Sequence, residues 1–218
     1  MTRSCALALA LALVLVSPAP GQSTWEPERT WVYVVGILEW QDSDTWSPFP
    51  KEDRRDKALV GFFRASGVPE DQIVYLRDET ATRTRVDQTF GPFLSRARQG
   101  DLLVLYFCGH GWREDARTTY FATYDAGEDM ESTAWSVGSI FDSIEKGFGG
   151  SSAWLMADCC HSGSLAVTAE RREKRGRLRV SYGCLASSLA REASTGAWTF
   201  SDAVLASLRG DGLVDEDG

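Results

Sequence analysis

Three features that would mark common classes of protein are missing from this sequence. It has no Cys-x-x-Cys pair, and its adjacent cysteines Cys159 and Cys160 would rarely both bind one tetrahedral ion, which disfavours a zinc site. It has no excess of positive charge. The formal net charge of −8 argues against non-specific binding to nucleic acid or to an anionic membrane.

A long apolar run is the third missing feature. The longest one, Ala6 to Val16, is shorter than the roughly 20 residues that cross a bilayer. Arg3 precedes this run, and small or helix-breaking residues follow it at 17–21. That order is typical of a secretory signal peptide, here residues 1–22, with an uncleaved anchor as the alternative. We therefore expect an exported protein, periplasmic or secreted, without membrane attachment after signal removal.

Histidine is scarce, and both histidines lie beside cysteines. Cys108-Gly109-His110-Gly111 follows the apolar run 102–107, and Asp158-Cys159-Cys160-His161-Ser162-Gly163 follows the run 152–157. Such runs are typical of strands buried on both faces of a parallel sheet, and the carboxyl ends of these strands carry reactive groups. We expect a thiol and an imidazole to meet there, where the imidazole can take the thiol proton.

These motifs resemble those of the caspase-like cysteine peptidases, and most closely the metacaspase and bacterial caspase-like branch. The histidine and cysteine are also separated by about fifty residues, as in that clan. The resemblance covers about Thr30 to Leu208. It implies a caspase-like peptidase domain that cleaves peptide or protein substrates after Arg or Lys, through a Cys-His dyad and an acyl-enzyme. It implies no required cofactor, with calcium as a candidate activator.

The resemblance assigns Cys160 as the nucleophile, because the family motif places the catalytic thiol third. Strand geometry agrees, since successive side chains point to opposite faces and one thiol at most can face His110. Cys159 is then a small buried hydrophobic residue. His110 is the general base, and we interpret His161 as structural. By resemblance, the N–H groups of Gly111 and Cys160 form the oxyanion hole.

Substrate specificity is assigned to acidic residues. Asp158 lies on the same strand face as the nucleophile, and the matching aspartate of metacaspases helps to hold Arg or Lys. A second acid is expected from Asp53 or Asp56, with Asp53 preferred and a helix N-cap as the alternative for either. Cys108 stands in the pocket wall where the family usually has serine.

Alternating strands and helices predict an α/β fold, a three-layer α/β/α sandwich with a mostly parallel sheet. Strands are expected at 30–38, 73–76, 102–107, 152–157 and 179–186, with a short extended piece at 120–123. Helices are expected at 53–65, 84–99, from 136 and at 201–208. Residues 39–50 are predicted to form a surface loop. The acidic tail 209–218 resembles the start of a truncated EF-hand-like segment or is disordered, and Asp125 and Asp129 are calcium candidates only by position.

Residues 169–179 form a basic run, which we interpret as a solvated loop with at most a helical turn. Caspase-like enzymes are often processed in this interval, and an enzyme that prefers Arg or Lys would find six sites there. We therefore expect self-cleavage at one or more of Arg171, Arg172, Lys174, Arg175, Arg177 and Arg179.

Two other functions stay open. A caspase-like fold without activity could act as a binding module, although both dyad residues are present. A zinc-binding protein could use Cys108, His110, Cys159, Cys160 and His161. Two disulfides are a further alternative for the four cysteines that follow residue 22.

Overall fold

The computed structural model of the chain describes residues 25–176, 178–193 and 198–211. The predicted signal peptide, Arg177 and residues 212–218 of the predicted tail lie outside these residues. Within the described ranges, no helix is both long and apolar enough to cross a membrane.

A five-stranded parallel sheet forms the centre of the molecule, in the order β2-β1-β3-β7-β8. Its strands are β1 (Thr30–Gly36), β2 (Ile73–Arg77), β3 (Leu102–Cys108), β7 (Ser152–Asp158) and β8 (Ser181–Ala186). The strands β1, β3 and β7 are almost fully buried, apart from Trp154, which is why they are continuous apolar runs in the sequence. All five expected strands are therefore present, β8 beginning two residues late.

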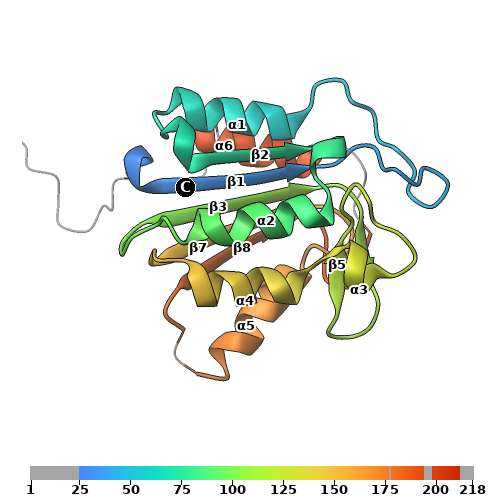
Figure 1. Cartoon of the computed structure of the whole chain (residues 1–218). Helices are drawn as coiled ribbons and strands as arrows, with labels where there is room; N and C mark the ends of the chain where they lie inside the picture. Colours follow the sequence, from blue (N-terminus) through green and yellow to red (C-terminus); the bar gives the residue numbers. More distant parts are fainter. Residues whose placement is uncertain (1–24, 177, 194–197, 212–218) are drawn as a thin grey trace, which may run out of the picture.

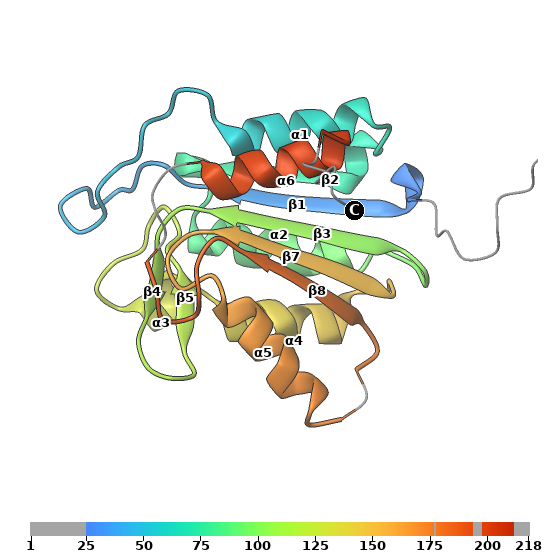
Figure 2. The ribbon, with the colours of Figure 1, turned by 180° about the vertical axis from the view of Figure 1, so that it is seen from behind.

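Helices cover both faces of this sheet (Figures 1 and 2). One face carries α1 (Arg55–Ala65) and α6 (Thr199–Arg209), and the other carries α2 (Arg83–Leu94), α4 (Val137–Gly147) and α5 (Ser164–Glu173). Alternate strand residues face the two cores: Val104 and Tyr106 pack with the first pair, Leu103 and Leu105 with the second group. The three-layer α/β/α sandwich is confirmed.

Helix α4 shows how closely periodicity can define an element. Its N-cap is Ser136, whose hydroxyl accepts a hydrogen bond from the Ser139 N–H at 3.4 Å. Four apolar residues at helical spacing are all buried against the sheet, as the pattern predicts: Val137, Ile140, Phe141 and Ile144.

A small antiparallel sheet lies at the carboxyl ends of the central strands (Figure 1). It consists of β4 (Gly111–Arg113), β5 (Thr119–Phe121) and β6 (Trp135–Ser136), with α3 (Met130–Thr133) before β6. The sequence predicted one extended piece here. The other two strands have three and two residues, too short to show an alternating pattern. Single 3₁₀ turns occur at Pro27–Arg29, Glu70–Gln72 and Asp78–Thr80.

Two larger differences from the prediction concern helices. Helix α2 ends at Leu94 instead of residue 99, with Ser95 as its C-cap, and it continues through Pro92. The basic run was predicted to be a loop with at most a helical turn, yet α5 continues to Glu173. Arg172 fixes this helix to its neighbour α4 by pairing with Asp142 at 2.7 Å and Glu145 at 2.9 Å.

Candidate active site

One cavity of about 450 Å³ gathers the residues that the sequence singled out. His110, Cys160, Asp158, Asp53 and Cys108 all line it. The register of the sheet explains this convergence, because Gly36, Cys108 and Asp158 are paired at the ends of β1, β3 and β7. The two motifs therefore leave adjacent parallel strands at the same edge.

The two neighbouring thiols have different surroundings. Cys159 is 2% exposed and belongs to the core under α2, α4 and α5. Its burial raises the pKa of the thiol well above the ordinary value. Cys160 is half-buried and lies on the cavity wall. Both cysteines border the cavity, and they differ in burial: Cys159 lies in the core, whereas Cys160 is half-buried, as alternation along this strand end predicts.

The chain turns sharply after Cys160. His161 has a left-handed backbone with φ of +60°, and its N–H donates to the Glu192 carbonyl at 2.9 Å. The His161 ring is not among the residues that line the cavity, and its buried Nδ1 has no partner in the described part of the chain. This placement is consistent with a structural part for His161.

An aromatic shell surrounds His110. Its ring centroid lies 4.5 Å from that of Trp40, 5.5 Å from Trp46 and 4.5 Å from Phe49. The tryptophans are 4% and 8% exposed, and their indole N–H groups donate to the carbonyls of Ala122 and Ala126. Residues 39–50 do form a loop that is largely exposed, as predicted, but the loop also places its two tryptophans in the core beside the imidazole. The aromatic residues of this segment were the feature of the sequence that could have indicated its burial.

One hydrogen bond defines the tautomer of His110. Its Nε2 lies 2.8 Å from the Ser47 carbonyl oxygen, which can only accept, so Nε2 carries the hydrogen. In the neutral form of the ring, Nδ1 is then the unprotonated nitrogen. Burial among the aromatic rings lowers the pKa of His110, partly offset by this hydrogen bond. Ser47 was not identified from the sequence, since nothing local marks a carbonyl as a partner.

Gly111 lies directly against the Cys160 backbone. A Cβ atom there would come within 1.9 Å of the Cys160 carbonyl oxygen, so glycine is required by this close approach. The Ala122 N–H donates to the His110 carbonyl at 3.0 Å, which makes the Gly111–Phe121 pair a non-hydrogen-bonded one. The ladder of β4 and β5 therefore leaves the Gly111 N–H available, as an oxyanion hole requires.

Asp158 is an acid without a cationic partner. Its carboxylate accepts hydrogen bonds from the hydroxyls of Ser201, at 2.5 Å, and of Ser187. No ion pair reaches it from any described residue. Burial is the main reason that the pKa of Asp158 is raised, since the carboxylate has lost water without gaining a cation.

The structure separates the two candidates for the second acid. Asp53 lines the cavity, with a left-handed φ of +52°. Asp56 is completely buried, where it pairs with Arg54 at 2.8 Å and accepts from the Tyr75 hydroxyl at 2.7 Å. The N-cap of α1 is Arg54, so the capping alternative is wrong for both acids. Arg55 also lines the cavity, and its charge is balanced by Asp202.

Arg54 fixes the loop that carries Asp53. Its guanidinium donates to the Gly36 carbonyl at 2.8 Å, and to Asp56 and Asp78 carboxylates. Asp78 in turn accepts from the Leu38 N–H at 2.9 Å. This buried network joins the end of β1 to the start of α1 and so stabilises one side of the cavity. The sequence did not predict it, because its members are distant in the chain.

Cys108 is fully buried beneath the cavity, and this burial raises the pKa of its thiol well above the ordinary value. It is thus a poor candidate for a nucleophile. None of the four described cysteines forms a disulfide, so the alternative of two disulfides is wrong.

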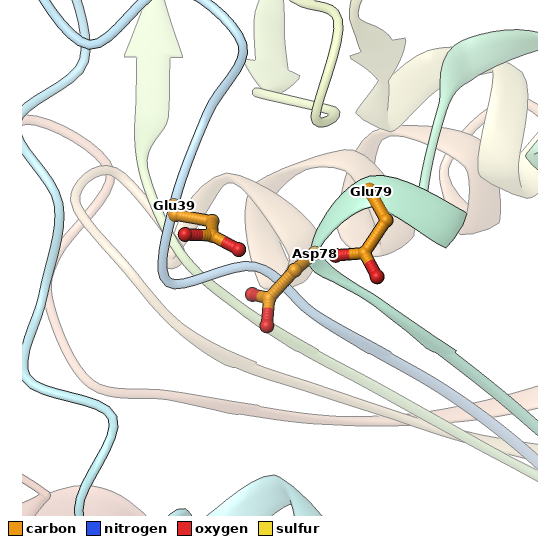
Figure 3. A group of neighbouring side chains, drawn as sticks. All are labelled: Glu39, Asp78 and Glu79. Atoms are coloured by element: carbon orange, nitrogen blue, oxygen red, sulfur yellow. The ribbon is translucent and has the colours of Figure 1, made fainter.

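The calcium candidates have structural partners. Asp125 accepts hydrogen bonds from the Arg83 N–H and the Thr123 hydroxyl, and Asp129 caps α3. Among the described residues, carboxylates that could share an ion are those of Glu39, Asp78 and Glu79 (Figure 3). Asp78 is already paired with Arg54, and Glu39 with Lys51 at 2.5 Å. The thiols and imidazoles of the two motifs form no such group within the described ranges.

Comparison with solved structures finds similar folds. No protein-family model matches the chain, and no curated protein matches it. The crystal structure of protein GSU0716 from Geobacter sulfurreducens is similar, with a TM-score of 0.61 and 11% sequence identity. The match covers 84% of this chain and 82% of that chain. At this identity the likeness concerns the fold alone.

Proposed function

We propose that this protein is a cysteine endopeptidase that cleaves peptide bonds after Arg or Lys. The observation that carries the proposal is the cavity itself, where a half-buried thiol, a neutral imidazole and an acid without a cation converge. The resemblance of the two motifs to those of metacaspases supports the same reaction.

In the proposed mechanism, His110 Nδ1 takes the proton of Cys160, and the thiolate Sγ attacks the carbonyl carbon of the substrate. The carbonyl oxygen becomes an oxyanion held by the N–H groups of Gly111 and Cys160. The imidazolium then protonates the leaving amine, and a thioester remains on Cys160. Water, deprotonated by His110, attacks this thioester and releases the carboxylic acid and the thiol.

The cavity supports a preference for a cationic side chain. Asp158 offers a carboxylate whose charge is poorly solvated, and a bound guanidinium or ammonium would stabilise it. Asp53 adds a second carboxylate on the same wall, while Arg55 is neutralised by Asp202. The net charge facing a substrate is therefore negative.

Fluorogenic peptides that differ only in the residue before the cut test this proposal. We expect cleavage after Arg and Lys and little after Asp, Leu or Ala. Thiol titration with a small electrophile should reveal one fast-reacting thiol at neutral pH. A protein that cleaves no peptide and has no accelerated thiol would instead be a binding module.

The pH dependence of kcat/KM should reflect the buried imidazole. Burial lowers the pKa of His110, so the base stays neutral as the pH falls below the ordinary histidine value of about 6.5. Activity should be lost only as the pH passes through this lowered pKa. Phe49→Ala exposes the imidazole and should move the acidic limb upward, whereas Trp25→Phe, outside the site, should not. A wild-type limb at or above 6.5 would contradict this account.

Self-cleavage is expected at fewer positions than the sequence indicated. Arg171 and Arg172 lie in α5, and the Arg179 guanidinium donates to the Phe148 carbonyl. Helical or fixed segments are poor substrates, because a peptidase binds an extended chain. Lys174 and Arg175 lie at the end of the helix and are exposed, and Arg177 lies outside the described residues.

Self-cleavage can be measured by incubating the wild-type protein and the Cys160→Ala variant in parallel, with and without calcium. The masses of the fragments are then determined by mass spectrometry. Fragments ending at Lys174, Arg175 or Arg177 are expected in the wild type alone. An intact wild-type chain that still cleaves an Arg peptide would refute self-cleavage and leave the peptidase proposal standing.

A further inference from the structure

Two basic cavities that share lining residues lie outside the candidate active site. The narrower holds about 120 Å³, and its charged lining residues are all arginines: Arg113, Arg117, Arg171 and Arg191. The wider holds about 430 Å³, shares Arg117, Thr168 and Arg171 with the first, and adds Arg172, Lys174 and Arg175. We call the two cavities together the arginine groove. Its charge contrasts with the net charge of −8 of the whole chain.

Most of this positive charge is uncompensated. Arg172 pairs with Asp142 and Glu145, and Lys174 with Glu170. The other arginines form no ion pair within the described part of the chain: Arg113, Arg117, Arg171, Arg175 and Arg191. Asp115 accepts from the N–H groups of Arg117 and Thr118 at 2.6 and 2.7 Å, and it offsets part of the Arg117 charge, as Glu170 does for Arg171. The groove is therefore electrostatically prepared for an anion.

A buried hydroxyl in the narrow cavity also lacks a partner. Ser164 is 7% exposed, lines this cavity, and its Oγ has no hydrogen-bond partner among the described residues. A buried hydroxyl left unpaired costs about 1–3 kcal/mol, and an oxygen acceptor in the cavity would satisfy it. Ser164 is also the first residue of α5, where the helix dipole favours negative charge.

The arginine groove adjoins the candidate active site through the backbone. Helix α5 starts four residues after Cys160, and β4 starts directly after His110. Gly111, the first residue of β4, packs against the Cys160 carbonyl. The elements that carry the groove are therefore continuous in the chain with the segments that carry His110 and Cys160.

We propose that the arginine groove binds an acidic peptide segment. One carboxylate would lie in the narrow cavity, against Ser164 and the arginines, and further carboxylates would lie along the wider cavity. A peptide fits better than a lone inorganic anion, because two cavities that share lining residues extend farther than one small ion requires. The inference rests on the proposed function, since the segment would belong to the substrate, beside the bond that is cut.

Binding to the Cys160→Ala protein tests this without any turnover. The probes are a fluorescein-labelled Glu-rich peptide, its Gln-rich counterpart and inorganic phosphate, followed by fluorescence anisotropy. We expect the Glu-rich peptide alone to bind, more weakly as ionic strength rises. Arg113→Gln combined with Arg171→Gln should weaken binding about tenfold or more. Arg85→Gln, an exposed arginine on α2, is the matched control.

Ser164→Ala distinguishes a role of the hydroxyl in peptide binding from a role in the stability of the fold. Because its hydroxyl has no partner within the described protein, this variant should keep or raise its Tm while binding the Glu-rich peptide several-fold more weakly. Unchanged affinity in the double arginine variant, equal binding of the Gln-rich peptide, or binding of phosphate alone would each overturn the proposal. If the protein binds the Glu-rich peptide but cleaves no peptide, the proposal for the arginine groove stands and only the proposed peptidase function is rejected.

Discussion

Cys160→Ala should abolish hydrolysis of an Arg peptide, with kcat/KM falling by a factor on the order of 10⁴ or more, since the proposed thioester forms on its Sγ. Cys159→Ala should keep most of the activity. Cys159 lies in the core and its burial raises the pKa of its thiol, so its removal should cost mainly stability, about 1 kcal/mol. Steady-state kinetics and thermal unfolding of both variants measure the two effects separately.

His110→Ala is the companion variant. Its loss should match that of Cys160→Ala, and the double variant should lose little more, because members of one catalytic unit are not additive. Equal loss in Cys159→Ala and Cys160→Ala, with folding intact in both, would contradict the assignment of the nucleophile.

Asp158→Asn should reduce cleavage after Arg by about 2–5 kcal/mol of transition-state binding, because a buried charge pair with the substrate loses one partner. The amide keeps the size of the side chain and one oxygen to accept from Ser201 or Ser187. The fold should therefore persist, and the loss should be seen in kcat/KM for Arg and Lys peptides.

Asp53→Asn is the matched control for this variant. Asp53 lies on the same cavity wall but is exposed, so solvent screens its charge and the expected loss is much smaller. A wild-type protein that prefers Asp before the cut, or an Asp158→Asn protein with unchanged selectivity, would show that the cavity has been misinterpreted.

The central sheet and the convergence of His110 with Cys160 on one cavity could be predicted from the sequence. Continuous apolar runs identify the buried strands, and alternation along a strand end distinguishes Cys160 from Cys159. The surroundings of His110 could not be predicted. The Ser47 carbonyl and the indoles of Trp40 and Trp46 reach the imidazole through contacts distant in sequence, and such contacts leave no local pattern.

The basic run was misinterpreted for a different reason. The high charge of the segment indicated that it is exposed to solvent, and from this exposure we predicted a loop. In the structure Glu170 and Lys174 form an i,i+4 pair along α5, and Arg172 reaches acids on α4. Charge density shows which face of a segment meets water, but it does not distinguish an exposed helix face from a loop.

The pairing of β3 with β7 has a consequence for biogenesis. These strands are neighbours in the sheet, yet residues 109–151 separate them in the chain. Contacts between distant segments form late in folding, because a long loop must close before they gain any stabilisation. The imidazole and thiol therefore meet only after the sheet has assembled around both motifs. A nascent or still unfolded chain would carry the thiol without its base, so the activity proposed above would arise only with the native topology.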